Sequence, residues 1–485
     1  IKKKEHICII GDYDVDGCTS TSLFVNLLKQ LNTSYSYFIP NRITDGYGSS
    51  LNLIKKIIKE KTGLVIMLDN GSSSNKATNF LNERKIKSMI IDHHEIYNPY
   101  PKTNVLINPK KKCNYSEFNY LCSATLTYFF IDYYIKKQKL KIDFSYFLPL
   151  VLMATVSDVM PLRKINRTIA KTVLSDFNLS KNFFFSKVFE IKNINRPINI
   201  DDFAFIFGPI INSAGRLDDP NIIVKLFTSN KKEIINSITN KLILLNEKRK
   251  LIENKIIKNI NLKFIKSNLN SIIILEKKIL NEGLIGIIAS RLKTYFNKPA
   301  IVMTKSGSFY KGSARSTENF NIGILIKKAL DYKLLESGGG HNLAAGFTIR
   351  KEKIDFFNKF IYKNNKKILP IKFKYFSKIS FNAINKTFLS DLKNLEPYGE
   401  GNLNPFFLIE DIKFVKTKVI HNKMITCFIK NNSGKMLPAI SFSLFERDIF
   451  DNILNNKNKL NIIVQLKENF WNNKKNLQIL IIDIL

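Results

Sequence analysis

The sequence predicts a multidomain α/β protein: a parallel sheet covered by helices, a long connecting helix, a second α/β domain and a small C-terminal β-barrel. At 485 residues the chain is too long for one ordinary core. In its first half, short apolar strands alternate with amphipathic helices, a pattern typical of a parallel sheet with both faces covered. Towards the C-terminus five short strands follow one another, which suits a small barrel.

The first predicted strand and the acidic loop after it organise the N-terminal domain. The apolar run Ile7–Ile10 is typical of a buried parallel strand, and Asp12, Asp14 and Asp16 follow it at alternating positions. Ligands bind at the carboxyl edge of parallel sheets, so these carboxylates can converge on one point. A bound divalent cation would most simply offset the repulsion between these carboxylates. The alternative interpretation is a solvent-exposed acidic turn.

Further ligand-type side chains follow other predicted strands. Asp69 ends the third strand, and Asp92, His93 and His94 end the fourth, while Asp158 follows an apolar helix. Carboxylates with one or two imidazoles fit Mn²⁺ or Mg²⁺ better than Zn²⁺. The predicted helices here are Thr19–Leu31, Ser50–Lys61, Asn75–Arg84 and Phe147–Val156, and the further strands are Tyr35–Ile39, Leu64–Leu68 and Ser88–Ile91.

The amino-acid composition indicates which kind of binding partner and which cellular compartment to expect. The net charge of +36 favours a polyanionic partner, although lysine accompanies asparagine and isoleucine throughout the chain and is in part compositional. Five cysteines without a CxxC pair argue against disulfides and zinc knuckles and favour a reducing cytoplasm. No apolar run is long enough to span a membrane, and no signal peptide is evident. The chain starts at Ile1, which leaves open whether an N-terminal segment has been removed or lost.

A connector separates the two halves. The segment Asp201–Arg216 carries small residues that allow close backbone approach, with Asn212 among them, and it ends in Arg216, which is suited to clamp a phosphate. A structural turn with a surface arginine is the alternative. From Lys231 to about Ile265, helical periodicity without Gly or Pro predicts a long helix that bridges two domains.

The second half contains two predicted anion-binding segments. Strands are expected over Ile272–Leu275 and Ala300–Met303. In the segment after them, Gly and Ser residues let backbone N–H groups face an anion, with Arg315 as the fork. The segment Ser337–Gly346 is predicted to cradle phosphate at a helix N-terminus. The candidate residues in these two segments are Ser313, Arg315, Ser316, Gly339, Gly340 and His341.

The third unit begins after Lys374 with a turn-rich hinge and continues as short strands. A small barrel of the OB type would bind single strands by stacking bases on aromatic side chains. Trp471, in a predicted loop between Asn and Lys residues, is the preferred stacking candidate, ahead of Phe428, Phe442, Phe445 and Phe470. The expected strands are Ile412–Val419, Met424–Lys430, Met436–Ser441, Leu460–Lys467 and Leu477–Ile482.

The motifs GDYDVDG, LDNG, DHH, SDV and GGHNLAAG together resemble the DHH phosphoesterase superfamily, in particular its single-strand-specific exonucleases, over essentially the whole chain. The resemblance implies a catalytic DHH domain over 1–230, a connector helix over 231–268, a DHHA1 domain over 269–373 and an OB-like domain over 374–485. It implies that Asp92 orients its neighbours. It also implies two divalent ions held by Asp12, Asp14, Asp16, Asp69, His93 and Asp158, with His94 as a further ligand or facing the scissile phosphate. A histidine usual in these exonucleases is replaced here by Asn281.

The resemblance implies a metal-dependent exonuclease that degrades single-stranded DNA 5′→3′ to 5′-mononucleotides in DNA repair and recombination. Two alternatives stay open: a DHH phosphoesterase acting on cyclic dinucleotides or oligoribonucleotides, and an inactive scaffold. The extra unit after Lys374 argues against the first, and the complete set of acidic motif positions against the second. We expect a cytoplasmic monomer without membrane contact, whose partners besides single-stranded DNA would be a helicase and a single-strand-binding protein.

Overall fold

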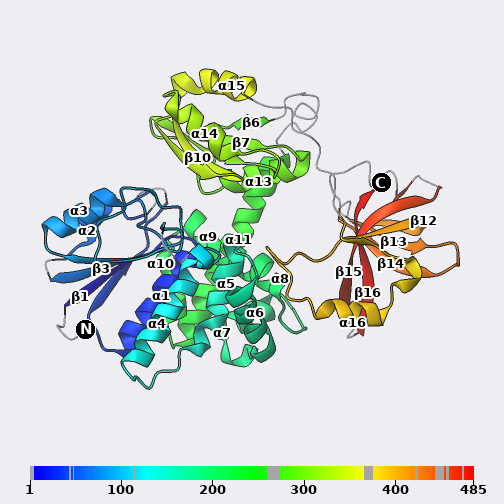
Figure 1. The fold of residues 1–485 in the computed structure, drawn as a ribbon, viewed down its shortest axis with the longest axis horizontal. Helices are drawn as coiled ribbons and strands as arrows, with labels where there is room; N and C mark the ends of the chain where they lie inside the picture. The colour runs from blue at the N-terminus through cyan, green and yellow to red at the C-terminus, as the bar shows by residue number, and fades with distance from the viewer. Residues whose placement is uncertain are drawn as a thin grey trace. The chain divides into compact units, whose positions relative to one another are not determined.

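The chain folds as two compact units, Ile1–Ile368 and Leu369–Leu485 (Figure 1). In the part of the chain that is described, no helix combines the length and apolar character that a membrane crossing requires. The computed structural model describes residues 5–42, 45–46, 48–59, 61–112, 116–258, 272–364, 375–420, 424–442, 453–454, 458–471 and 474–485.

The first unit begins with a five-stranded sheet in the order β2-β1-β3-β4-β5, and every pairing in it is parallel. The parallel sheet expected from the sequence is confirmed. The edge strand β5 was not predicted, because three residues are too short for a periodicity signal. The strands are β1 (His6–Ile10), β2 (Tyr35–Phe38), β3 (Thr62–Leu68), β4 (Lys87–Ile91) and β5 (Val105–Ile107).

Helices cover both faces of this sheet, as alternate strand residues show. Ile7 and Ile9 of β1 belong to the core that contains α1 (Val15–Gln30) and α4 (Ser123–Lys137). Cys8 and Ile10 pack into a second core with α2 (Leu51–Ile57) and α3 (Asn75–Glu83), on the other face in Figure 1. Because side chains alternate along a strand, a strand buried on both faces is continuously apolar, as observed for β1.

A helical region extends the first core and leads into the long helix α11 (Lys232–Lys258), whose 27 residues begin one position after the predicted start. Residues 259–271, which include the predicted end of this helix, lie outside the described part. The preceding helices are α5 (Leu148–Ser157), α6 (Lys164–Asp176), α7 (Phe183–Ile191), α8 (Ile200–Asp202), the π-helical turn η4 (Phe203–Phe207), α9 (Gly208–Leu217) and α10 (Asn221–Thr228).

A second sheet follows α11 in the order β6-β7-β8-β10-β9, with both parallel and antiparallel pairs. Its core is separate from that of the first sheet. Its strands are β6 (Ile273–Glu276), β7 (Ala300–Ser306), β8 (Phe309–Arg315), β9 (Ser337–His341) and β10 (Ala344–Arg350), and its helices are α13 (Ile285–Phe296), α14 (Ile322–Asp331) and α15 (Ile354–Lys363).

Two sequence-based expectations about this second sheet are wrong. The glycine-rich segment does not open a helix, because β9 and β10 pair antiparallel and Ala345 is buried in the sheet core. Strand pairing overrides the helix preference of its two alanines. The backbone N–H groups around Ser313 do not face an anion either, since β8 pairs with β7 and β10 and its backbone groups serve those ladders. The side chains of Ser313 and Arg315 stay candidates for anion binding.

The second unit contains a closed five-stranded barrel. The strands pair in the order β12-β13-β14-β16-β15, and a further pairing of β12 with β15 closes the ring. All five predicted strands are confirmed, with β12, β15 and β16 longer than expected. The short strand β11 (Ser377–Lys378) adds an outer pairing. The elements are β12 (Phe407–Ile420), β13 (Met424–Lys430), β14 (Met436–Ser441), β15 (Leu460–Trp471), β16 (Lys474–Ile484) and α16 (Lys386–Lys393).

Candidate metal centre and arginine group

The acidic side chains lie at the carboxyl edge of the first sheet, because β1, β3 and β4 each end there. Asp69 follows β3 in a left-handed backbone conformation, with φ 62°. The next side chain, Asn70, fixes this turn by donating to the carbonyls of Ile10 (3.2 Å) and Leu68 (2.8 Å). The strained turn is therefore tied to the ends of two strands, which sets the direction in which Asp69 points.

Helix α1 begins at Val15, four residues before the predicted start. Asp14 is its N-cap and accepts the N–H of Gly17 at 3.0 Å, which satisfies a backbone donor that the helix leaves open. Asp16 thus belongs to the first turn of a helix and not to a loop. The periodicity of apolar residues missed this turn because its side chains are mostly acidic or small.

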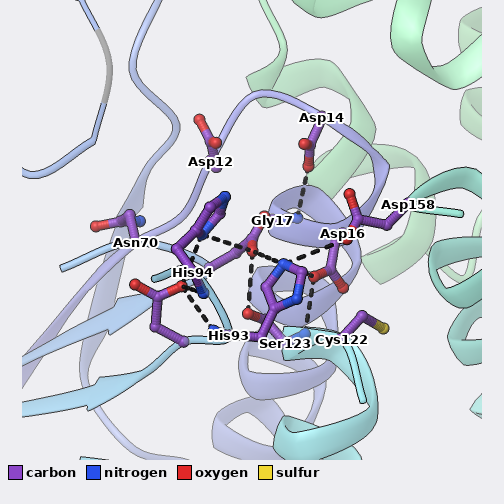
Figure 2. A network of polar contacts seen from close by, with 12 residues as sticks. Asp12, Asp14, Asp16, Gly17, Asn70, His93, His94, Cys122, Ser123 and Asp158 are labelled. Atoms are coloured by element: carbon purple, nitrogen blue, oxygen red, sulfur yellow. Dashed lines mark hydrogen bonds and ion pairs between the residues drawn. The ribbon is translucent and has the colours of Figure 1, made fainter. Parts of the chain in front are cut away.

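Seven side chains form three overlapping groups of metal-ligand type. The Nε2 atom of His93 lies 3.3 Å from Asp158, 3.4 Å from Asp69 and 3.7 Å from Asp16 (Figure 2). In each group the ligand atoms lie within 4.8 Å of one another. Asp69 and His93 each belong to two groups. The groups are Asp69 with His93 and His94, Asp16 with His93 and Asp158, and Asp12 with Asp14 and Asp69.

The electrostatics of these groups fit a bound cation. Burial first, and neighbouring carboxylates second, raise the pKa of Asp12, Asp69 and Asp158 well above the ordinary aspartate value. Burial lowers the pKa of His93, so its neutral form, the one that binds metals, is favoured. Among the described residues the buried Oδ2 atom of Asp69 has no hydrogen-bond donor. A carboxylate-rich set with an orphaned oxygen suits Mn²⁺ or Mg²⁺.

Asp92 organises the loop that carries the two histidines. Its Oδ1 atom accepts the backbone N–H of His93 (2.8 Å) and of His94 (3.1 Å) and contacts Nδ1 of His94 at 2.8 Å. Its Oδ2 atom accepts the N–H of Ser72. Burial alone lowers the pKa of His94, but the hydrogen bond and charge of Asp92 outweigh it and raise that pKa to about 9.

The partners of Asp16 were not found by sequence reasoning. Its two oxygens accept the backbone N–H groups of Ser123 (2.8 Å) and Ala124 (2.7 Å) at the start of α4, and the Ser123 hydroxyl donates to Asp69 at 3.0 Å. A helix N-terminus stabilises negative charge, so α4 holds two of the carboxylates in place. Nothing local in a Ser-Ala pair, 107 positions from Asp16, reveals this contact.

Three arginines gather near the acidic loop, and we refer to Arg42, Arg216 and Arg315 as the arginine group. Burial, Arg42 and Arg249 lower the pKa of Arg216 to about 10, and burial and Arg42 lower that of Arg315. The guanidinium of Arg42 lies 5.4 Å from the ring centre of Tyr13. Among the described residues no carboxylate forms an ion pair with any member of the group. Arg42 was missed because it stands alone in a loop, without a motif pointing to it.

The remaining predicted residues fall in different places. Asn212 lies on α9, one turn before Arg216, and His341 is exposed at the end of β9 together with Gly340. The Ser316 hydroxyl donates to the carbonyl of Phe320 (2.5 Å) and is therefore engaged inside the fold. Gly339 is also exposed on β9, and Ser313 lies on β8 beside Arg315, whose guanidinium donates to its hydroxyl at 3.2 Å.

The structure also places Asn281, which replaces a histidine usual in these exonucleases, and the aromatic residues proposed to stack on bases. Asn281 accepts the N–H of Gly283 at 2.8 Å and shapes the loop before α13. Trp471 was expected in a loop, but it ends β15, because that strand continues beyond the predicted limit. Its side chain lies outside the described residues, as do those of Phe445 and Phe470. Phe428 and Phe442 are exposed by 38% and 56%.

Comparisons with known proteins agree with this architecture. Residues 6–155 match the N-terminal domain of the DHH family, residues 269–367 match the DHHA1 domain, and residues 377–483 match the RecJ OB domain. The chain thus resembles RecJ-type members of the DHH family in each of its three domains. Its resemblance to this family, expected from the motifs, is confirmed, as are the parallel-sheet domain, the second α/β domain and the OB-like barrel.

Relatives and solved structures of the RecJ-type family align over most of the chain. The single-stranded-DNA-specific exonuclease RecJ of Haemophilus influenzae is 29% identical over 92% of this chain and 82% of its own length. RecJ of Bacillus subtilis is 25% identical over the whole chain, and RecJ of Escherichia coli 29% identical over 73% of it. The chain spans only 62% and 65% of these two relatives.

The fold itself matches solved RecJ structures. The crystal structure of RecJ in complex with Mn²⁺ from Thermus thermophilus superposes with a TM-score of 0.85 at 21% identity, covering all of this chain and 69% of that one. A crystal structure of exonuclease RecJ bound to manganese has a TM-score of 0.64 at 24% identity, covering 75% and 90% of the two chains.

Proposed function

We propose that the chain is a metal-dependent exonuclease that hydrolyses phosphodiester bonds of single-stranded DNA from the 5′ end, releases 5′-mononucleotides and serves DNA repair and recombination. One observation carries the proposal: seven ligand-type side chains meet in overlapping groups at one sheet edge, in a chain with the three RecJ-type domains. The relatives named above are single-stranded-DNA-specific exonucleases, which supports the same substrate here.

The three ligand groups suit two divalent ions, Mn²⁺ or Mg²⁺. Asp12, Asp14 and Asp69 would hold one ion, and Asp16, His93 and Asp158 would hold the other. His94 would complete the set. When bound, such ions activate a water molecule and offset the charge of the phosphate. Asp92 keeps His93 and His94 oriented through its hydrogen bonds, and Ser123 does the same for Asp16 and Asp69.

The arginine group supplies an anion site next to the proposed ions. Its three arginines are half-buried and form no ion pair among the described residues, so a phosphate is their natural counter-charge. We assign to Arg42, Arg216 and Arg315, with the Ser313 hydroxyl, the 5′-terminal phosphate of the strand. Asn212, Ser316, Gly339, Gly340 and His341 remain proposed contacts to the strand backbone, and the last three lie on the open edge strand β9.

Each of the proposed domains would have its own role. Residues 1–230 would hold the ions, and the connector over 231–268 would link them to the phosphate-binding domain over 269–373. Residues 374–485 would bind the strand, with Trp471 as a base-stacking candidate. We also propose a cytoplasmic monomer that works with a helicase and a single-strand-binding protein. Gel filtration and co-purification with such partners would test this last part.

The deciding experiment is digestion of single-stranded DNA labelled at either end, with Mn²⁺ or with EDTA. We expect immediate release of labelled mononucleotide from the 5′-labelled strand only, abolished by EDTA and by Asp69→Asn. Asp132→Asn, which removes a partly exposed carboxylate paired with Lys136, is the matched control and should cleave normally. Cleavage of cyclic dinucleotides or short oligoribonucleotides in place of DNA would move the chain to the small-substrate enzymes, and binding without any cleavage would make it a scaffold.

A further inference from the structure

A buried carboxylate outside the proposed metal centre lies between helices α11 and α13. Glu253 on α11 is fully buried, and its oxygens contact two arginines. Arg249 lies one turn earlier on the same helix and forms a close ion pair with it, and Arg291 on α13 reaches it at 3.3 Å. Asn246 accepts from Nε (3.0 Å) and Nη2 (2.8 Å) of Arg249, so this guanidinium is held on two sides.

A buried ion-pair network of this kind does not by itself indicate that its role is to stabilise the fold. Removing a carboxylate and its arginine partner from water costs several kcal/mol, and apolar side chains of similar volume fill such a site at least as well. The arrangement instead fixes orientation, because charged hydrogen bonds tolerate little displacement. Here the orientation that is fixed is that of α13 relative to α11, since Arg291 and Glu253 stand on these two helices.

Helix α13 and the loop before it also lie against two members of the arginine group, Arg216 and Arg315. Arg216 donates to the carbonyl of Gly283, just before α13, at 2.9 Å. In the first turn of α13, a Cβ atom on Gly286 would lie 3.1 Å from Nη2 of Arg315 and 3.2 Å from Oγ of Ser313. A displacement of α13 would therefore move Arg216 and Arg315 with respect to each other.

Charge gives a second reason for the carboxylate. Arg42 and Arg249 both act electrostatically on Arg216. Among the described residues, Glu253 is the acidic side chain that forms ion pairs with Arg249 and Arg291, and no carboxylate pairs with the arginine group. Arg249 lowers the pKa of Arg216 and Glu253 raises it, so the field of Glu253 reaches the arginine group. Without the carboxylate, like charges would repel one another until a phosphate bound.

We propose that Glu253 is a positioning residue of the anion site: by holding Arg249 and Arg291 it docks α13 on α11 and keeps Arg216 and Arg315 spaced for one phosphate group. The inference rests on the proposed function and adds the residue that preorganises its phosphate site. The anion site would then bind the 5′-phosphorylated end of a single strand in preference to a 5′-hydroxyl end.

The test compares 5′-phosphorylated and 5′-hydroxyl oligodeoxynucleotides of one sequence with wild type, Glu253→Gln and the control Glu247→Gln, which removes an exposed carboxylate from the same helix. For Glu253→Gln we expect KM for the phosphorylated strand to rise about 3- to 30-fold. We expect kcat and the KM for the hydroxyl strand to change less than about twofold. Glu247→Gln should match the wild type. Equal losses on both strands, or an unchanged preference, would overturn the proposal.

A second variant and a binding assay keep the result interpretable. Arg291→Met removes a half-exposed partner and should shift the preference in the same direction even where Glu253→Gln folds poorly. If the wild type cleaves neither strand, the proposed function fails, but the affinity ratio of the two strands in EDTA, measured by fluorescence anisotropy, still tests Glu253. The role assigned to Glu253 would be contradicted by a wild type that binds both strands with equal affinity. It would also be contradicted if Arg291→Met kept the wild-type ratio of the two affinities.

Discussion

Individual side chains in the metal centre serve more than one neighbour. Asp69 contacts His93, receives a hydrogen bond from Ser123 and belongs to two ligand groups, while its Oδ2 atom remains without a donor among the described residues. A buried carboxylate in this state is costly unless a cation completes it. The consequences of single substitutions therefore depend on whether they remove a ligand or a residue that orients one.

Ser123→Ala tests an orienting residue. The substitution removes the hydroxyl that donates to Asp69 but leaves both backbone N–H groups on Asp16. We expect kcat or the apparent affinity for Mn²⁺ to fall about 10-fold, the lower part of the range for outer partners of metal ligands, as measured by Mn²⁺ titration of nuclease activity. Ser22→Ala, which removes a buried hydroxyl bonded to a carbonyl within α1, should change neither quantity by more than about twofold.

Asp92→Asn tests the origin of the His94 charge. The hydrogen bond and charge of Asp92 keep the His94 pKa at about 9 against the effect of burial. Without that charge, we expect the pKa to fall clearly below about 9, because only the charges of Asp12 and Asp14 then oppose the lowering effect of burial. NMR titration of the histidine ring signals in EDTA measures this pKa. A value that stays near 9 in the variant would contradict the assigned cause.

At the scale of elements, close contact between α9 and the loop after β1 brings Arg216 towards the acidic residues. Gly215 lies against the backbone of Tyr13, where a Cβ atom would approach the Tyr13 carbonyl oxygen to 2.3 Å. The small residues of the connector were predicted to permit a close backbone approach, and this contact confirms it. The contact joins segments far apart in the sequence, so only the folded chain identifies the partner.

Gly215→Ala should separate these two elements. Since the Tyr13 carbonyl belongs to the backbone and cannot rotate away, we expect a loss of about 1–3 kcal/mol in the free energy of unfolding, measured by urea denaturation. Gly346→Ala on β10 is the control, because its Cβ atom would meet nothing nearer than 3.9 Å, and it should change stability by less than about 0.5 kcal/mol. Equal effects of both substitutions would argue against the close contact.

For the whole molecule, the acidic centre makes stability depend on pH and on metal. The pKa values of Asp12, Asp69 and Asp158 are raised above 3.8, and that of His94 is raised from 6.5 to about 9. A group with a raised folded-state pKa stabilises the fold at pH values below its unfolded pKa. That stabilisation is lost as the pH rises through the folded pKa.

We therefore expect the melting temperature in EDTA to fall as the pH rises from about 4 to about 9, with Mn²⁺ reversing the fall most strongly at the high end. Differential scanning calorimetry across this range, with and without Mn²⁺, measures both effects. Asp69→Asn should show a shallower fall, because one of the raised groups is gone. A melting temperature that rises across this window in EDTA would contradict the assigned pKa directions.

How much the sequence predicts depends on whether the signal is local. The strand at Ile7–Ile10 was found from its continuous apolar run, and the barrel strands and the long helix from periodicity. In each case the element displays its own buried residues in its sequence. The seven ligand-type side chains were found from their places at strand ends and from the DHH motifs, since parallel strands carry their carboxyl ends to one edge.

Features that depend on contacts between distant residues emerged only in the folded chain. The glycine-rich segment became the edge strand β9, because pairing with β10 outweighed the helix preference of the alanines. Folding also brought α4 to Asp16, Arg42 to Arg216 and Arg291 to Glu253, and no local pattern announces such pairs. Local patterns thus specify the elements and the identity of the ligands, whereas the packing of helices from separate segments specifies which side chains orient those ligands and where phosphate would bind.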